Sequence, residues 1–129
     1  MRAVRCFALA VLVLAVSCGW YAARADEESR NVIIAAMRRV FSGQDPPLIQ
    51  RVAAGDANET EKQRLLKVLT GLADTTADRG SAESWKAKTA ALLSAAQDVV
   101  AGKEGAGARL QSAANCRACH SAHRPGGDR

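Results

Sequence analysis

AESWKAKTAALLSAAQDVVA, residues 82–101, is the most regular stretch of this sequence and decides its fold class. Apolar residues recur in it with the three-to-four-residue period of an amphipathic α-helix. They are Trp85, Thr89, Leu92/Leu93, Ala96 and Val99/Val100. Ser81 stands directly before the stretch and is a favourable N-cap residue. The pattern therefore predicts a helix over 82–101 that buries one face.

The segments before this helix repeat the same pattern. Asn58 followed by Glu61 is the signature of a capping box, so it predicts a helix over 59–76. The expected buried face of that helix is Leu65/Leu66, Leu69, Leu72/Ala73 and Thr76. A further helix is expected over Glu27–Phe41, with Val32/Ile33, Ala36/Met37 and Val40/Phe41 at helical spacing. The consecutive prolines Pro46 and Pro47 end it, and Leu48–Ala54 adds one or two helical turns before Gly55.

The segment after residues 82–101 predicts one more helix. A glycine-bounded loop runs from Gly102 to Gly107, and a helix near 106–123 follows it and ends before Pro125. The sequence contains no alternating strand pattern. We therefore expect an all-α fold, an antiparallel up-and-down four-helix bundle with short connections.

The first 25 residues predict a removed signal peptide rather than part of the bundle. Arg2 and Arg5 are followed by an apolar run over 6–16, which is about half of the ~20 residues that a transmembrane helix needs. Ala23 and Ala25 form a small-residue cleavage site before Asp26. The alternative is lipoprotein processing at Cys18. The expected organisation is a signal peptide over 1–25, a bundle over 26–124 and a flexible tail over 125–129, with export to the periplasm or beyond and no transmembrane anchor.

Removing residues 1–25 changes the composition of the chain. Three arginines and no acidic residue leave with them, so 15 basic residues face 13 acidic ones and the net charge falls from +5 to +2. A nucleic-acid partner is therefore not implied. Phe41 and Trp85 become the only aromatic residues, a small set for the core of a hundred-residue domain. An apolar group from outside the sequence would supply the missing volume.

The chemistry of the chain is concentrated in Cys116-Arg117-Ala118-Cys119-His120, a C-x-x-C-H motif. Two thiols three residues apart share one face of a helix and can both bond the vinyl groups of one haem, while the histidine that follows can bind the iron. A disulfide or a thioredoxin-like redox pair of Cys116 and Cys119 is an alternative, but no βαβ pattern surrounds the two cysteines. A zinc site made with His123 would require four ligands within one short helix to converge tetrahedrally. The motif thus predicts one covalent haem c.

The motif's place at the C-terminal end of a helical, exported chain resembles the cytochrome c prime family. The resemblance covers residues 26–124, and it implies a left-handed four-helix bundle that encloses the haem. Family members commonly continue the motif with two residues, an aromatic residue and a basic one. Arg124 matches the basic position beside the axial ligand, whereas His123 departs from the aromatic one. A plain helix-end cation is the alternative for Arg124.

The family also implies two alternatives for the iron ligand opposite His120. Low-spin members supply a methionine from the first helix and carry electrons, and others stay five-coordinate and bind nitric oxide or carbon monoxide. Met37 is the only methionine after residue 25 and shares an apolar face with Ile33 and Val40. It is the candidate ligand, with ordinary core packing as the alternative. Ile33 and Val40 are, with Arg124, further candidates for the haem pocket. Trp85 is expected either to pack on the haem or to anchor the core.

The sequence thus predicts an electron-transfer protein rather than an enzyme, because both histidines lie at the axial-ligand end of the chain. Its expected partners are redox proteins, with a homodimer and a small gas ligand as further alternatives. Single basic residues that could meet the haem propionates, or simply be solvated, are Arg38, Arg39, Lys86 and Lys88.

Overall fold

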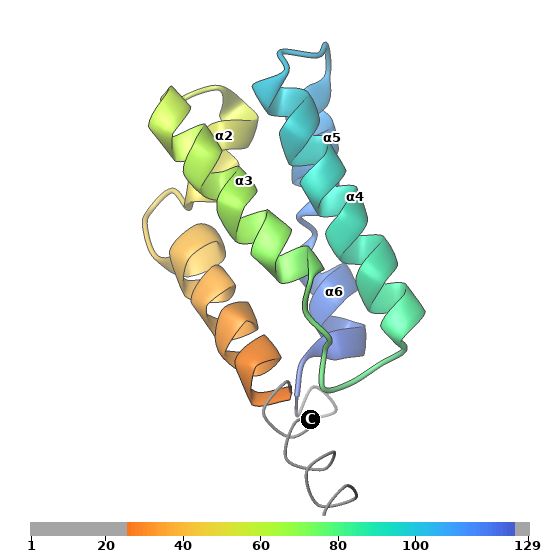
Figure 1. Ribbon diagram of the computed structural model, residues 1–129. Helices are drawn as coiled ribbons and strands as arrows, with labels where there is room; N and C mark the ends of the chain where they lie inside the picture. The colour runs from red at the N-terminus through yellow and green to blue at the C-terminus, as the bar shows by residue number, and fades with distance from the viewer. Residues whose placement is uncertain (1–25, 126–129) are drawn as a thin grey trace, which may run out of the picture.

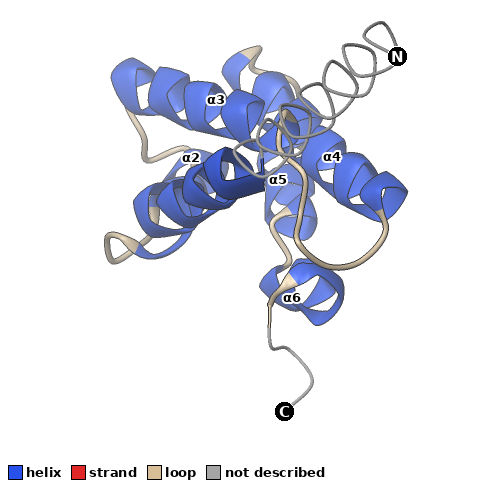
Figure 2. Ribbon diagram, turned by 60° about the horizontal axis from the view of Figure 1, so that its bottom comes forward, coloured by secondary structure: helices blue, strands red, loops and turns tan. Residues whose placement is uncertain are grey.

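The computed structural model describes residues 26–125, and this part of the chain is all-α, without any strand (Figures 1 and 2). Residues 26–36 form a helix that continues as the π-helix η1 (Met37–Ser42). The elements that follow are α2 (Leu48–Ala54), α3 (Glu59–Ala73), α4 (Ala82–Val100), α5 (Ala106–Ala113) and α6 (Cys116–His123). None of these described helices is both long and apolar enough to span a membrane. The predicted signal peptide, 1–25, and the end of the predicted tail, 126–129, lie outside the described residues.

Helix α4 is central to the packing. It lies against α3 on one side and α5 on the other, and it also contacts α6, while α2 packs on α5 and α3 (Figure 1). The largest fully buried side chains come from four different segments, α3, α5, η1 and α2: Leu65, Leu69, Leu110, Val40 and Val52. Burying a side chain of this size contributes about 1.5–3 kcal/mol, so these contacts hold the helices together.

The predicted helix starts are confirmed. The Asn58 side chain accepts a hydrogen bond from the Glu61 amide at 3.0 Å, and the Glu61 carboxylate accepts one from the Asn58 amide at 3.1 Å. Ser81 caps α4 by accepting from the Ser84 amide at 3.1 Å. Gly55 ends α2 in a left-handed conformation, with φ of 88°, which a glycine adopts without strain. Local capping chemistry therefore sets these boundaries.

The predicted end of α3 is wrong by about one turn. The helix ends at Ala73 and not at Thr76, and Thr76 is exposed. The Thr75 hydroxyl donates to the Leu72 carbonyl at 2.6 Å, and the Thr75 carbonyl accepts from the indole Nε1 of Trp85 at 2.9 Å. These bonds satisfy backbone groups at the helix end, so the chain leaves the helix before the periodic pattern ends.

The predicted single helix over 106–123 is also wrong, because it is two helices. Ala114 ends α5, and Asn115 takes an extended conformation in which its side chain accepts from the Ala118 amide at 3.0 Å. Asparagine is among the best N-cap residues, and here it competes successfully with continuation of the helix. The break gives α6 a direction of its own, and Cys116 is the first residue of that helix (Figure 2).

The first helix changes its winding at Met37. Over η1 the helix widens to a π-helix, and the Ser42 hydroxyl donates to the Met37 carbonyl at 3.0 Å. Such π-segments are often found at functional sites, since they change the direction in which side chains point. The π-helix ends at Gly43, where an added Cβ would lie 2.2 Å from the Arg38 carbonyl oxygen. Met37 is the first residue of this segment.

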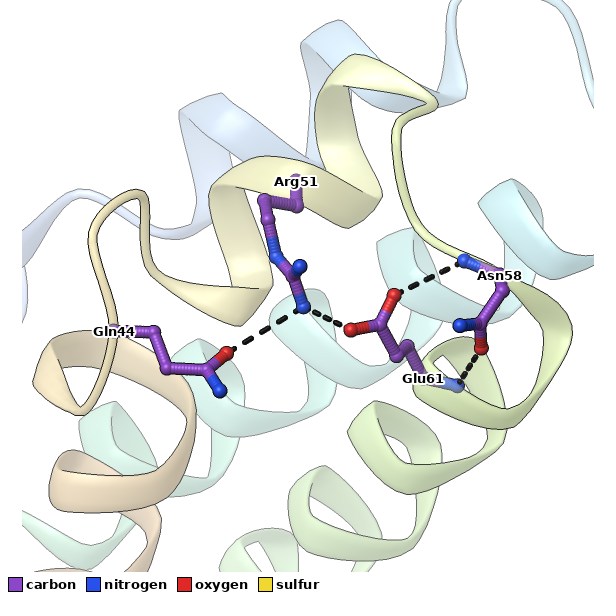
Figure 3. A network of polar contacts seen from close by, with 4 residues as sticks. All are labelled: Gln44, Arg51, Asn58 and Glu61. Atoms are coloured by element: carbon purple, nitrogen blue, oxygen red, sulfur yellow. Dashed lines mark hydrogen bonds and ion pairs between the residues drawn. The ribbon is translucent and has the colours of Figure 1, made fainter.

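A polar network ties α2 to the start of α3 (Figure 3). The Arg51 guanidinium pairs with the Glu61 carboxylate and donates to the Gln44 side chain at 3.5 Å. The Asn58 amide and the Arg51 charge hold the pKa of Glu61 below its ordinary value, the amide more strongly. A carboxylate with a lowered pKa stabilises the fold above its ordinary pKa, and this contribution is lost as the pH falls through the lowered value.

We therefore expect Glu61→Gln to lower the free energy of unfolding at neutral pH. The difference in this free energy between wild type and variant should become smaller as the pH falls into the range where carboxyl groups titrate. Urea denaturation at neutral and acidic pH measures this difference. Glu104→Gln is the matched control, because within residues 26–125 the Glu104 carboxylate has no hydrogen bond or ion pair. An equal difference at both pH values would contradict the expectation.

Candidate functional site

A cavity of about 230 Å³ opens where the first helix, α4 and the α5–α6 junction meet. It is several times larger than the ~30 Å³ that one water molecule occupies in the liquid. Most of its lining is apolar. The lining residues are Met37, Phe41, Leu72, Trp85, Lys88, Thr89, Ala91, Leu92, Ser112, Ala113, Ala114, Asn115, Cys116, Ala118, Cys119 and His120. The structure thus brings both cysteines, the adjacent histidine and the single methionine after residue 25 to one apolar hollow.

The two cysteines line this cavity as free thiols. Cys116 is exposed and Cys119 is partly buried. Burial raises the pKa of the Cys119 thiol, and the nearby Lys88 ammonium opposes that rise. Because the residues are three apart on α6, both sulfur atoms face the same side of the helix. Two thiols on one wall can bond one planar group at two points.

His120 follows on the same wall and is partly buried. It lines the first cavity and also a second one, of about 440 Å³, which shares Met37, Trp85 and Cys119 with the first. Within residues 26–125 its imidazole has no hydrogen bond or ion pair. A neutral imidazole nitrogen without a protein partner is available as a metal ligand.

Met37 comes from the first helix and lines both cavities. Ile33 lines the second cavity with it. Val40 has no exposed surface and belongs to the core, so it lines neither cavity. Met37 and His120 therefore line one hollow from two different helices.

Trp85 and Arg124 occupy different places around the motif. Trp85 is buried, lines both cavities, and donates from its indole Nε1 to the Thr75 carbonyl at 2.9 Å. Trp85 therefore belongs to the core and also lines the cavity beside the motif, while its packing on a haem stays a prediction. Arg124 is exposed and lines only the second cavity, which also contains the Arg30–Asp78 ion pair at 2.9 Å.

His123 is used differently from His120. It is 5% exposed, and its ring nitrogens contact the Arg79 carbonyl oxygen at 2.8 Å and the Ser84 hydroxyl at 3.0 Å. Within the described chain no three His, Cys, Asp or Glu side chains gather so that they could hold a metal ion. The zinc alternative would need His123 as a ligand, and both of its nitrogens are already engaged.

The residues present fit a covalently held haem. The group requires a large apolar hollow, two thiols on one wall and a free imidazole beside them, and the first cavity has all three. Lys88 lines this cavity, whereas Arg38 and Arg39 line a separate groove against α3, and Lys86 lines none of the cavities described here. Of the four basic candidates, Lys88 is therefore the one beside the motif.

Sequence reasoning missed several residues of the cavity wall. Leu72, Thr89 and Leu92 were expected to be buried and are, but periodicity could not show that they face the motif. Phe41 lines the first cavity from η1, where the change in winding alters the faces of the helix. These positions depend on how α3, α4 and the first helix pack around α6.

No protein-family model matches the chain, and neither the curated proteins nor the solved structures contain a match to it.

Proposed function

We propose that this chain is an exported c-type cytochrome that transfers electrons through one covalent haem. Cys116 and Cys119 would form the thioether links, and His120 and Met37 would bind the iron. The observation that carries the proposal is the shared cavity, which both thiols and His120 line from α6 and Met37 lines from the first helix. The C-x-x-C-H spacing supports it independently.

In this proposal the helices form an antiparallel up-and-down bundle with α5 and α6 together as its last member. The haem lies between α6 and the first helix. The break at Asn115 turns α6 so that the two cysteines and His120 face the cavity. The bundle supplies the apolar walls, and the covalent links supply the attachment.

The bound haem would supply a one-electron iron couple, and the chain's residues would tune it. Trp85, Phe41 and Leu92 line the cavity and would form apolar walls around the bound group. His120 donates a nitrogen and Met37 a thioether, the pair that raises the potential in cytochromes c. Apart from the motif itself, Lys88 is the one ionisable residue that lines the first cavity. Because, among the described residues, His120 is the one histidine that lines the first cavity and no aspartate or glutamate lines it, we propose a carrier rather than an enzyme, with redox proteins as partners.

The absorption spectrum of the purified protein tests the function. We expect haem to stay with the chain through denaturing electrophoresis and acidic acetone, because thioether bonds survive both. We further expect low-spin ferric bands that carbon monoxide does not perturb before reduction and perturbs little after it. A high-spin spectrum with strong carbon monoxide binding would support the alternative function, a five-coordinate protein that binds nitric oxide or carbon monoxide.

Export is the second part of the proposal and has its own prediction. We expect the intact mass of the exported protein to correspond to a chain that begins at Asp26 and carries one haem, because Ala23 and Ala25 suit signal cleavage. Mass spectrometry of the periplasmic fraction measures this. A mass that begins at Cys18 with added lipid would contradict it and place the protein on a membrane surface.

A further inference from the structure

Helix α6 carries the motif but has few contacts of its own. His123 is its only buried residue, and Cys116, Arg117 and Ala118 are exposed. A helix of eight residues is too short to be stable alone in water, so its direction depends on what holds it to the rest of the fold. His123 is the side chain whose position allows it to hold α6 against the rest of the fold.

Both ring nitrogens of His123 are held by neighbouring segments. Nδ1 lies 2.8 Å from the Arg79 carbonyl oxygen, which can only accept, so Nδ1 carries a proton and donates. In the neutral ring Nε2 then accepts from the Ser84 hydroxyl at 3.0 Å. One bond joins α6 to the turn between α3 and α4, and the other joins it to the first turn of α4. A buried ring bonded at both ends has a single preferred orientation.

The surroundings fit this ring closely. Trp85 meets it edge to face, with ring centroids 5.3 Å apart and planes at 68°. Gly80 has a φ of +82°, and a Cβ there would lie 2.6 Å from His123 Nδ1 and 2.8 Å from the Ala122 carbonyl oxygen. The turn can therefore approach α6 this closely only with glycine at position 80. We call His123, Gly80, Ser84 and the Arg79 carbonyl the α6 clamp.

We propose that His123 is a positioning residue that fixes the orientation of the axial ligand His120. The two residues are three apart, so they lie nearly one above the other on α6. A rotation of α6 that breaks the clamp must turn the His120 imidazole by the same angle. Only the identity of the group that His120 binds rests on the proposed function; the clamp itself rests on the contacts.

The test compares four variants. His123→Phe keeps an aromatic ring against Trp85 and removes both hydrogen bonds, and Gly80→Ala disturbs the clamp from the other side with His123 intact. His123→Asn is the conservative rescue, since its amide nitrogen can replace Nδ1 as the donor to the Arg79 carbonyl. Leu110→Ala is the matched control: it removes a fully buried side chain from α5 that lines neither cavity around the motif.

For His123→Phe and Gly80→Ala, we expect backbone amides of α6 to exchange about tenfold faster than in wild type, the effect of losing a buried hydrogen bond. The ferric absorption spectrum and the reduction potential should shift with them. His123→Asn should bring the exchange rates, the spectrum and the potential part of the way back to their wild-type values. Leu110→Ala should lower the thermal midpoint without changing the spectrum or the potential. An unchanged spectrum and potential in His123→Phe would overturn the positioning role, whatever the exchange rates.

The outcome for the clamp can be separated from the outcome for the function. If the wild-type protein carries no covalent haem, the proposed function fails, but exchange in α6 and the near-ultraviolet circular dichroism of Trp85 still report on the clamp in the same variants. Amide exchange rates in α6 and a Trp85 signal that both equal those of wild type in these variants would then overturn the clamp.

Discussion

Replacing both Cys116 and Cys119 by serine is expected to abolish covalent haem staining and to leave a chain with a broad, low thermal transition. Without the thioether links, the proposed haem would be held only by the side chains that bind its iron. Phe41 and Trp85, the only aromatic side chains in the described residues, line a cavity that would then be open to water. A domain of this size has little stability to lose, because it buries a smaller share of its surface than a larger one does.

Haem staining after denaturing electrophoresis and a circular dichroism melt measure the two effects. Arg117→Ser is the matched control, since it places a serine between the two cysteines at an exposed position and leaves the motif intact. Wild-type staining in the double-serine variant would sink the covalent attachment. A sharp transition that matches wild type would show that the helices pack adequately without the haem.

Met37→Ala is expected to open the iron site on the side of the first helix. Loss of the thioether, which favours ferrous iron, should lower the reduction potential, convert low-spin ferric bands to high-spin ones, and allow carbon monoxide to bind. A methionine that only packs the core would instead cost about 2–5 kcal/mol of stability on truncation, with little spectral change. The two roles therefore predict different kinds of result.

Met37→Leu distinguishes the effect of losing the sulfur ligand from the effect of losing side-chain volume. Leucine nearly conserves the volume and costs less than about 1.5 kcal/mol in a core, but it has no sulfur. We expect it to keep the thermal midpoint near that of wild type and to reproduce the spectrum and potential of Met37→Ala. If wild type and both variants share one high-spin spectrum, Met37 is a core residue and gas binding becomes the favoured function.

The helical character and the motif could be predicted because both depend on neighbours in the sequence. The capping box of Asn58 and Glu61 and the Ser81 cap formed as expected, since each uses bonds between residues three apart. The break at Asn115 depends on an equally local bond, to the Ala118 amide, but the apolar pattern continues across it. Periodicity could not show that capping would prevail over continuation there.

The sequence by itself determined an all-α chain, its buried stripes and a C-x-x-C-H segment on a helix, because these follow from the three-to-four-residue period and from the chemistry of adjacent side chains. Only the tertiary structure decided that Met37 shares a cavity with Cys119 and His120, that Val40 is core, and that His123 is bonded to Ser84 and the Arg79 carbonyl. The two hydrogen bonds of His123 join residues that are 39 and 44 positions apart in the sequence. They arise from the angles at which α6, α4 and the first helix pack, which no local pattern specifies.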